Sequence, residues 1–259
     1  VLTVLKAGQT IDFPEIGDQI ATNAPILFAM ASSGLPVDFA VASGLASITN
    51  GSTVVFAGAG EVAIVASQGG DGNWHAAPPV TNLFSVSKAS AAVALDGLSQ
   101  TYDGTARAAT ATTDPEGLAV QITYDGNFWA PTNAGSYAVT GTIDNARYHG
   151  STSGTLVVGK ASATVTLGDL TQTYDGTAKS ATATTDPADL TVAFTYDGVP
   201  TAPVDAGTYA VTGTVADANY EGFSNGIFSI DLAQVSIATL ISIVDGANLF
   251  GAIVTTVPE

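Results

Sequence analysis

The stretch Gln100-Thr-Tyr-Asp-Gly-Thr-Ala106 returns as Gln172-Thr-Tyr-Asp-Gly-Thr-Ala178, 72 residues later. Without any gap, residues 88–159 align with residues 160–231, and roughly 40 of the 72 positions are identical. Self-similarity at a fixed period is the signature of tandem modules that each fold as one small unit. The chain is therefore predicted to be an array of small domains.

Three Lys-Ala pairs, at Lys6, Lys88 and Lys160, divide the array. Each pair follows a short apolar run that resembles a closing strand, and links this short keep neighbouring modules close. The predicted divisions are 1–6 (the closing strand of a preceding module or an exchanged strand), 7–88 (the first module), 89–160 and 161–232 (two repeats) and 233–259 (the start of a third repeat).

Short apolar or alternating runs, separated by Gly, Pro, Asn and Asp, indicate strands in every module. In the first module they are Thr10–Phe13, Ile26–Ala29, Val37–Ala42, Ala46–Ile48, Thr53–Ala57, Glu61–Ala66 and Asn82–Val86. In the second repeat they are Ala163–Leu167, Ala178–Thr184, Leu190–Tyr196, Thr208–Val215 and Gly226–Ile230. No segment of helical length has a 3.6-residue apolar period, so we predict an all-β fold that begins with a sandwich.

The composition excludes several classes of partner. The chain has 23 acidic and 6 basic residues among 259, a formal charge of −17, which repels nucleic acid and anionic membranes. The apolar run at 235–244 is too short to insert into a membrane. Because the chain has no cysteine, neither a disulfide nor a thiolate metal site can form.

Short motifs in the first module and in the two repeats resemble those of two known domain families. Ala31-Ser-Ser-Gly-Leu-Pro-Val37, Gly58-Ala-Gly60 and Asp71-Gly-Asn-Trp74 resemble the bacterial Ig-like domains of very large secreted proteins. Both repeats resemble the MBG repeats, described as mucin-binding β-grasp-like modules, of bacterial surface proteins. In the second repeat the motifs are Thr173-Tyr-Asp-Gly-Thr-Ala178, Thr184-Thr-Asp-Pro187, Ala206-Gly-Thr-Tyr209 and Asp217-Ala-Asn-Tyr-Glu-Gly222.

The resemblances imply a tandem array of an Ig-like β-sandwich and two small MBG-like β modules. They place it in an adhesin or stalk outside a bacterial cell. A β-grasp fold usually adds a helix across the sheet, and the sequence offers no segment for one.

The candidate binding residues are aromatic. Phe128 and Trp129 stand where the second repeat has Pro200-Thr201, so the repeat scaffold does not require them. Their alternative role is a contact with a neighbouring module. Trp74 occupies the loop before the last strand of its module, as Tyr148 and Tyr220 do. There the favoured interpretation is an Asx turn that folds the aromatic over the end of the core.

The polar residues give little indication of a metal site or a catalytic site. Asp71, Asp144 and Asp217 are candidate calcium ligands, and solvated turn carboxylates are the favoured alternative, because no full ligand run surrounds them. The histidines, His75 and His149, lie in corresponding loops without a nucleophile motif. We predict no enzymatic activity and no required cofactor.

The predicted function is a non-enzymatic structural subunit or stalk segment of a bacterial extracellular fibre or surface protein. The alternative is an adhesin that recognises a host glycan or protein. Exposure of the candidate aromatics would favour binding, and their burial would favour the stalk.

A further hypothesis concerns self-assembly. The apolar N-terminal strand of one copy would complete the C-terminal part-module of the next by strand addition, head to tail. The residues involved would be Val1, Leu2, Val4, Leu5, Val235, Ile237, Ile241 and Ile243. The alternative is that the sequence is a window of a longer polypeptide.

Overall fold

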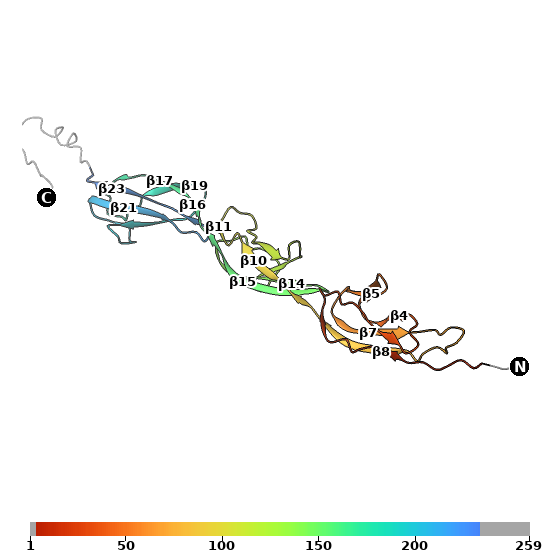
Figure 1. Ribbon diagram of the computed structural model, residues 1–259. Helices are drawn as coiled ribbons and strands as arrows, with labels where there is room; N and C mark the ends of the chain where they lie inside the picture. The colour runs from red at the N-terminus through yellow and green to blue at the C-terminus, as the bar shows by residue number, and fades with distance from the viewer. Residues whose placement is uncertain (1–3, 234–259) are drawn as a thin grey trace, which may run out of the picture. The chain divides into compact units, whose positions relative to one another are not determined.

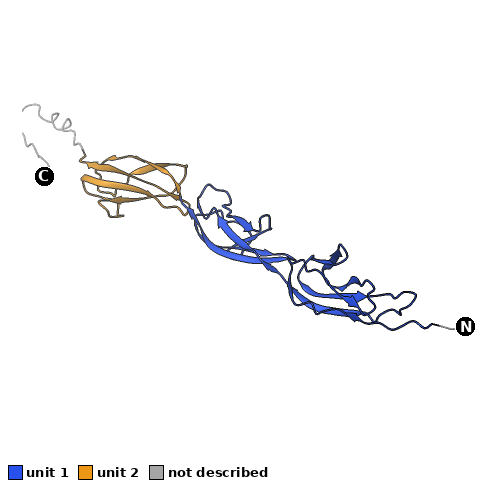
Figure 2. Cartoon of the chain, viewed as in Figure 1, with its two compact units in different colours: residues 1–160 blue, residues 161–259 orange. Residues whose placement is uncertain are grey.

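The computed structural model describes residues 4–233, and every regular element within them is a β-strand (Figure 1). The all-β prediction is thereby confirmed. The chain forms two compact units, Val1–Lys160 and Ala161–Glu259 (Figure 2). Residues 7–88 are called the sandwich below, 89–160 repeat 1 and 161–232 repeat 2. No helix in the described part of the chain is long and apolar enough to cross a membrane.

The sandwich has one four-stranded sheet in the order β2-β8-β7-β4 and two facing pairs, β1-β3 and β5-β6. The strands are β1 (Ile11–Asp12), β2 (Gln19–Ile20), β3 (Met30–Ala31), β4 (Asp38–Ser43), β5 (Ala46–Thr49), β6 (Thr53–Phe56), β7 (Gly60–Ser67) and β8 (Val80–Ser87). Val62 and Ile64 from β7 and Phe84 from β8 meet Val54 and Phe56 from β6 in one buried core. The sandwich therefore has two layers with apolar side chains between them.

Repeat 1 has a sheet in the order β11-β15-β14-β13, with β9 beside β15, and a separate β10-β12 pair. The strands are β9 (Ala89–Ser90), β10 (Ala92–Asp96), β11 (Ser99–Thr101), β12 (Thr110–Asp114), β13 (Gln121–Tyr124), β14 (Gly135–Asp144) and β15 (Tyr148–Gly159). Leu95 of β10 packs into the core formed by Val139, Leu156 and Tyr124. The β10-β12 pair therefore covers the sheet face on which the resemblance led us to look for a helix, and no helix occurs in the described residues.

Repeat 2 repeats this arrangement, with a sheet in the order β18-β23-β21-β20 and the pairs β17-β19 and β16-β22. The strands are β16 (Ala161–Ser162), β17 (Thr164–Gly168), β18 (Thr171–Thr173), β19 (Thr182–Asp186), β20 (Val192–Tyr196), β21 (Gly207–Val215), β22 (Tyr220–Glu221) and β23 (Phe223–Asp231). Phe228, Ile230, Val211 and Tyr196 form its core.

Most predicted strands are present, with two kinds of difference. Residues 26–29 form only an isolated bridge, Ile26 to Thr53, and the strand begins at Met30. The strand predicted at Ala178–Thr184 begins at Thr182. The short parallel strands β2, β9, β11, β16, β18 and β22 were not predicted. Strands of two or three residues are too short to show a period in the sequence.

Candidate functional site

Phe128 and Trp129 follow a tight turn at the end of β13. The turn residues Asp125 and Gly126 both have positive φ, 47° and 80°. Tyr124 and Asn127 exchange both backbone hydrogen bonds across them, at 2.7 and 2.8 Å. This is the two-residue hairpin geometry that an Asp-Gly pair favours, because both positions need the left-handed region.

Hydrogen bonds hold this turn on both sides. The Asp125 carboxylate accepts the Ala138 N–H of β14 at 2.8 Å. The Pro131 carbonyl, two residues after Trp129, accepts the Arg107 N–H at 2.8 Å. The segment that carries the aromatic pair is therefore fixed at both ends by the fold of repeat 1.

The aromatic side chains point into solvent from this fixed segment. Phe128 is 64% exposed and Trp129 is 86% exposed. Large aromatic side chains are usually at least partly buried, so two adjacent ones at this exposure need an explanation. Their exposure rules out a packing role within the described residues of repeat 1.

A charged pair, Asp103 and Arg107, lies on the loop that is hydrogen-bonded to the Pro131 carbonyl through the Arg107 N–H. The Arg107 guanidinium donates to the Asp103 carboxylate, which also accepts the Thr105 N–H at 2.9 Å. The pKa of Asp103 is lowered by the hydrogen bonds from Thr105 and by the nearby Arg107 charge. The carboxylate is therefore ionised at neutral pH, beside the segment that carries the aromatic residues.

Repeat 2 has the same scaffold without the aromatics. Asp197 accepts the Ala210 N–H at 2.8 Å, and the Lys179 N–H donates to Pro203 at 2.9 Å. Pro200-Thr201 stands in place of the aromatic pair. Repeat 2 is thus an internal reference in which the same turn carries no exposed aromatic ring.

The loop aromatics Trp74, Tyr148 and Tyr220 are half-buried, each at the end of an Asx turn. The Asp71 and Asp217 carboxylates accept the N–H groups of Trp74 and Tyr220, at 2.9 and 3.0 Å. The predicted Asx turns are confirmed, with one correction.

In repeat 1 the accepting side chain is that of Asn145, 2.8 Å from the Tyr148 N–H, and not that of Asp144. Asp144 instead forms an ion pair with Lys88, whose hydrogen bond lowers the pKa of Asp144.

No metal cluster accompanies the carboxylates. Within residues 4–233, no group of three or more His, Asp or Glu side chains is placed to hold a metal ion. Asp71, Asp144 and Asp217 lie in different modules. His75 and His149 are exposed, each in the same loop as an Asx turn. Within the first unit, Asp71 and His75 lie in the sandwich, whereas Asp144 and His149 lie in repeat 1.

A joint between the sandwich and repeat 1 was missed by the sequence reasoning. The Arg147 guanidinium donates to the Ala21 carbonyl from Nε at 3.2 Å and from Nη2 at 3.1 Å. The Ala59 N–H donates to the Ala146 carbonyl at 2.9 Å. A single basic residue in a loop gives no periodic signal, but the difference from Asn219 at the same place in repeat 2 could have indicated it.

Most residues of the assembly hypothesis lie outside the described part of the chain. Val4 and Leu5 are each 83% exposed. The others, namely Val1, Leu2, Val235, Ile237, Ile241 and Ile243, lie outside the described residues. Head-to-tail strand exchange stays a prediction.

Comparison with solved structures gives weak likenesses only. SGBP-B of the Bacteroides ovatus mixed-linkage glucan utilization locus, in complex with a mixed-linkage heptasaccharide, is 10% identical, with 88% of this chain and 71% of that chain covered and a TM-score of 0.27. Immunoglobulin domains 1–4 of Sidekick-1 are 14% identical, with 87% and 76% covered and a TM-score of 0.29. Drosophila N-cadherin EC1-4 is 10% identical, with 87% and 76% covered and a TM-score of 0.25. These scores are too low to support an inference about this chain.

Comparison of the sequence with known protein families identifies the family of the two repeats. No curated protein matches the chain. The MBG domain matches residues 91–162 and again residues 163–234, which together are more than half of the sequence. The two matches follow each other without a gap and share the motifs around Tyr102 and Tyr174. The chain belongs to the MBG domain family, of which it contains two tandem copies.

Proposed function

We propose that this chain is a non-catalytic, adhesin-type binding segment of an extracellular protein on a bacterial surface, with a glycan or a protein as its partner. The observation that carries the proposal is the exposed pair Phe128 and Trp129, fixed by the turn of repeat 1 and replaced in repeat 2 by Pro200-Thr201. We also propose an Ig-like domain for the sandwich.

The chemistry of the pair suits recognition. A flat indole can stack on the C–H face of a sugar ring or on a partner's apolar side chain, and burying one such ring gains roughly 1.5–3 kcal/mol. The fixed backbone lowers the entropy lost on binding. The neighbouring Asp103 and Arg107 offer an acceptor and donors for hydroxyl or amide groups. A platform of this kind needs no deep pocket.

A structural stalk is the second candidate, and the joint of the first unit favours it. Arg147, Ala59 and the Lys88–Asp144 ion pair tie the sandwich to repeat 1 in addition to the covalent link. A segment that resists bending at such a joint can hold a binding surface away from a cell. The two roles are compatible, because the aromatic pair and the joint use different loops of repeat 1.

The test exchanges the residues in which the repeats differ. The double variant Phe128→Pro, Trp129→Thr gives repeat 1 the residues of repeat 2, and Pro200→Phe, Thr201→Trp makes the reverse change. Each full-length protein is applied to arrays of host O-glycans and microbial and plant polysaccharides, and to immobilised mucin. We expect the first variant to lose at least tenfold in affinity for any target bound by the unchanged chain, with an unchanged melting temperature. Binding that survives the exchange, or no binding to any target, would count against this function.

A further inference from the structure

The first strand of the sandwich changes sheets at Pro14. β1 pairs with β3 through Asp12 and Met30, whereas β2 pairs with β8 in the opposite sheet. Continuing the register of β1 places Pro14 opposite Phe28, as the next pair that would exchange hydrogen bonds. Proline has no N–H to give, and the Pro14 carbonyl accepts the Asn82 side-chain amide at 2.8 Å instead.

This change leaves a short backbone edge open at Phe28. Residues two apart in a strand direct their N–H and C=O groups to the same edge, so those of Phe28 face the side on which Met30 pairs with Asp12. Among the described residues, no hydrogen-bond partner of the Phe28 backbone is present. The edge therefore offers one donor and one acceptor at the spacing of a β-ladder.

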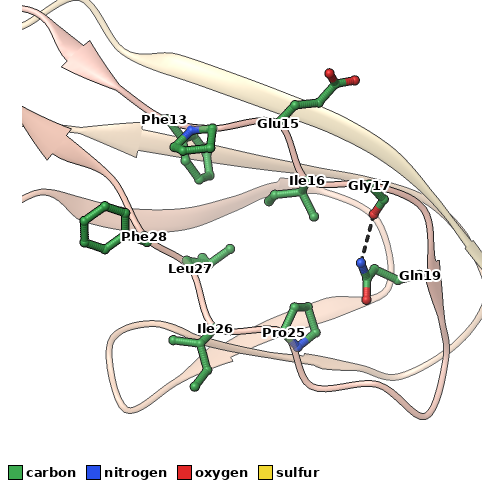
Figure 3. A pocket seen from close by; sticks show the side chains of 10 residues that line it. Phe13, Glu15, Ile16, Gly17, Gln19, Pro25, Ile26, Leu27 and Phe28 are labelled. Carbon is green, nitrogen blue, oxygen red and sulfur yellow. Dashed lines mark hydrogen bonds between the residues drawn. The ribbon is translucent and has the colours of Figure 1, made fainter.

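An opening lined by both apolar and polar groups lies between the two segments that separate there. It has a volume of about 240 Å³. In Figure 3, residues 13–17 and residues 25–28 face each other across it. Its lining includes Pro14, Ile16, Pro25, Ile26 and Phe28. The opening is of a size to take one apolar side chain from a segment lying along the edge.

An apolar row on the outer face continues from the opening. Ile26, Phe28 and Met30 are 75, 66 and 59% exposed, and the alternate residues Leu27 and Ala31 are buried. An outward row of a half-buried strand is normally polar, and apolar rows beside open edges are sites where other strands add. Scattered surface apolar residues are ordinary, but three in register beside an unpaired edge are not.

The charge of the sandwich indicates which occupant fits. Residues 7–87 contain no Lys or Arg. Their carboxylates are Asp12, Glu15, Asp18, Asp38, Glu61 and Asp71. Glu15 lines the opening itself. A second copy of this chain, whose formal charge is −17, would be repelled, whereas a cationic segment would be attracted.

We propose that the sandwich binds an extended segment of a partner protein that alternates apolar residues with Lys or Arg. The segment adds as a strand beside Phe28, where its backbone pairs with the open N–H and C=O. One apolar side chain enters the opening lined by Ile16 and Ile26. Its basic side chains lie near Asp12 and Glu15. This surface is separate from the aromatic pair of repeat 1 and does not depend on the function proposed for that pair.

The test uses defined peptides and the full chain. The probe is a seven-residue peptide that alternates Lys and Val, with capped ends. It is compared with a peptide in which Glu replaces Lys and with one N-methylated at the two Lys residues that flank the central Val. Binding is followed by NMR shifts of backbone amides. We expect the amide resonances of Phe28 and Met30 to shift when the Lys–Val peptide binds. The Glu peptide should bind at least tenfold more weakly, because its charge is repelled. The N-methylated peptide should lose roughly tenfold in affinity, because it cannot complete the ladder.

Two surface variants separate this site from general charge attraction. Phe28→Ser shortens the apolar row at an exposed position and should weaken the Lys–Val peptide at least fivefold, with an unchanged fold. Leu83→Ser, at an exposed position of β8, is the matched control and should leave binding unchanged.

Three results would overturn the proposal. Equal loss of affinity in both variants would mean non-specific apolar binding. Equal affinity for the N-methylated peptide would mean that no strand is added. A chain that dimerises in sedimentation experiments, and becomes monomeric with Phe28→Ser, would mean that a second copy covers this face.

Discussion

Removing the hydroxyl of Tyr124 should destabilise repeat 1 by about 1–3 kcal/mol. The hydroxyl oxygen accepts the Ala109 N–H at 2.8 Å, and both residues are only 5% exposed. Tyr124→Phe keeps the ring that packs on Val139 and Leu156 but leaves a buried N–H without an acceptor. The cost is therefore the desolvation of that N–H rather than a loss of packing.

Repeat 2 supplies the matched experiment. There the Tyr196 hydroxyl accepts the Ala181 N–H, also at 2.8 Å, so Tyr196→Phe should destabilise repeat 2 by a similar amount. Amide hydrogen exchange on the full chain reports the two repeats separately, in β14 and β15 and in β21 and β23. A cost of about 1.4 kcal/mol accelerates exchange roughly tenfold in the altered repeat. The other repeat should exchange as before.

A third variant tests the role of burial. The Tyr137 hydroxyl donates to the Asn133 carbonyl at an exposed site, at 2.9 Å. Water can replace this bond, so Tyr137→Phe should cost roughly 0.5 kcal/mol or less. If Tyr124→Phe cost no more than Tyr137→Phe, the buried N–H would have another acceptor and the reasoning would be refuted.

Three shorter predictions address other contacts. Gly150→Ala and Gly222→Ala each place a Cβ 2.1 Å from a facing backbone carbonyl oxygen, so each should cost roughly 1–3 kcal/mol; an unchanged calorimetric transition would contradict this. Arg147→Asn removes both guanidinium bonds to the sandwich, so NMR relaxation should show the sandwich and repeat 1 tumbling more independently; identical correlation times would show that the joint needs no arginine. Hydrogen bonds and a nearby cation lower the pKa of Asp103 and of Asp175 in the folded chain. The two ionised carboxylates therefore stabilise the fold at neutral pH, and this stabilisation is lost as the pH falls below the ordinary pKa of 3.8. Side-chain titration by NMR should show both carboxyl groups ionising below that value; a titration at the ordinary value would contradict the prediction.

The sequence was sufficient for the parts of the fold that carry a period. The 72-residue repeat, the all-β class and the long strands β14 and β21 each follow from patterns that extend over many residues. The Asx turns and the Asp-Gly turn were also predictable, because each depends on one or two residues with distinct backbone chemistry. The aromatic pair was found by comparing the two repeats with each other.

The remaining features depend on contacts between distant segments. The pairing of β2 with β8 joins Ile20 to Ser87, and nothing local to either strand specifies it. The joint through Arg147 needs the Ala21 carbonyl, 126 positions earlier in the chain. The open edge at Phe28 arises because Pro14 removes a partner that the β1 register would otherwise supply. Each is a tertiary effect of one residue, for which a single sequence gives no period to detect.

The two repeats together separate residues that fold the module from residues that serve something else. Several positions that hold the scaffold are the same in both: a buried tyrosine such as Tyr124, the turn Asp125-Gly126 and the tightly approached Gly150 all recur. Phe128 and Trp129 are exposed positions at which the repeats differ, and Arg147, which bonds to the sandwich, is another difference. A residue required for folding would be needed in both copies, so the exposed aromatic pair of repeat 1 needs a reason that folding does not supply. Binding to a partner outside the repeat supplies that reason.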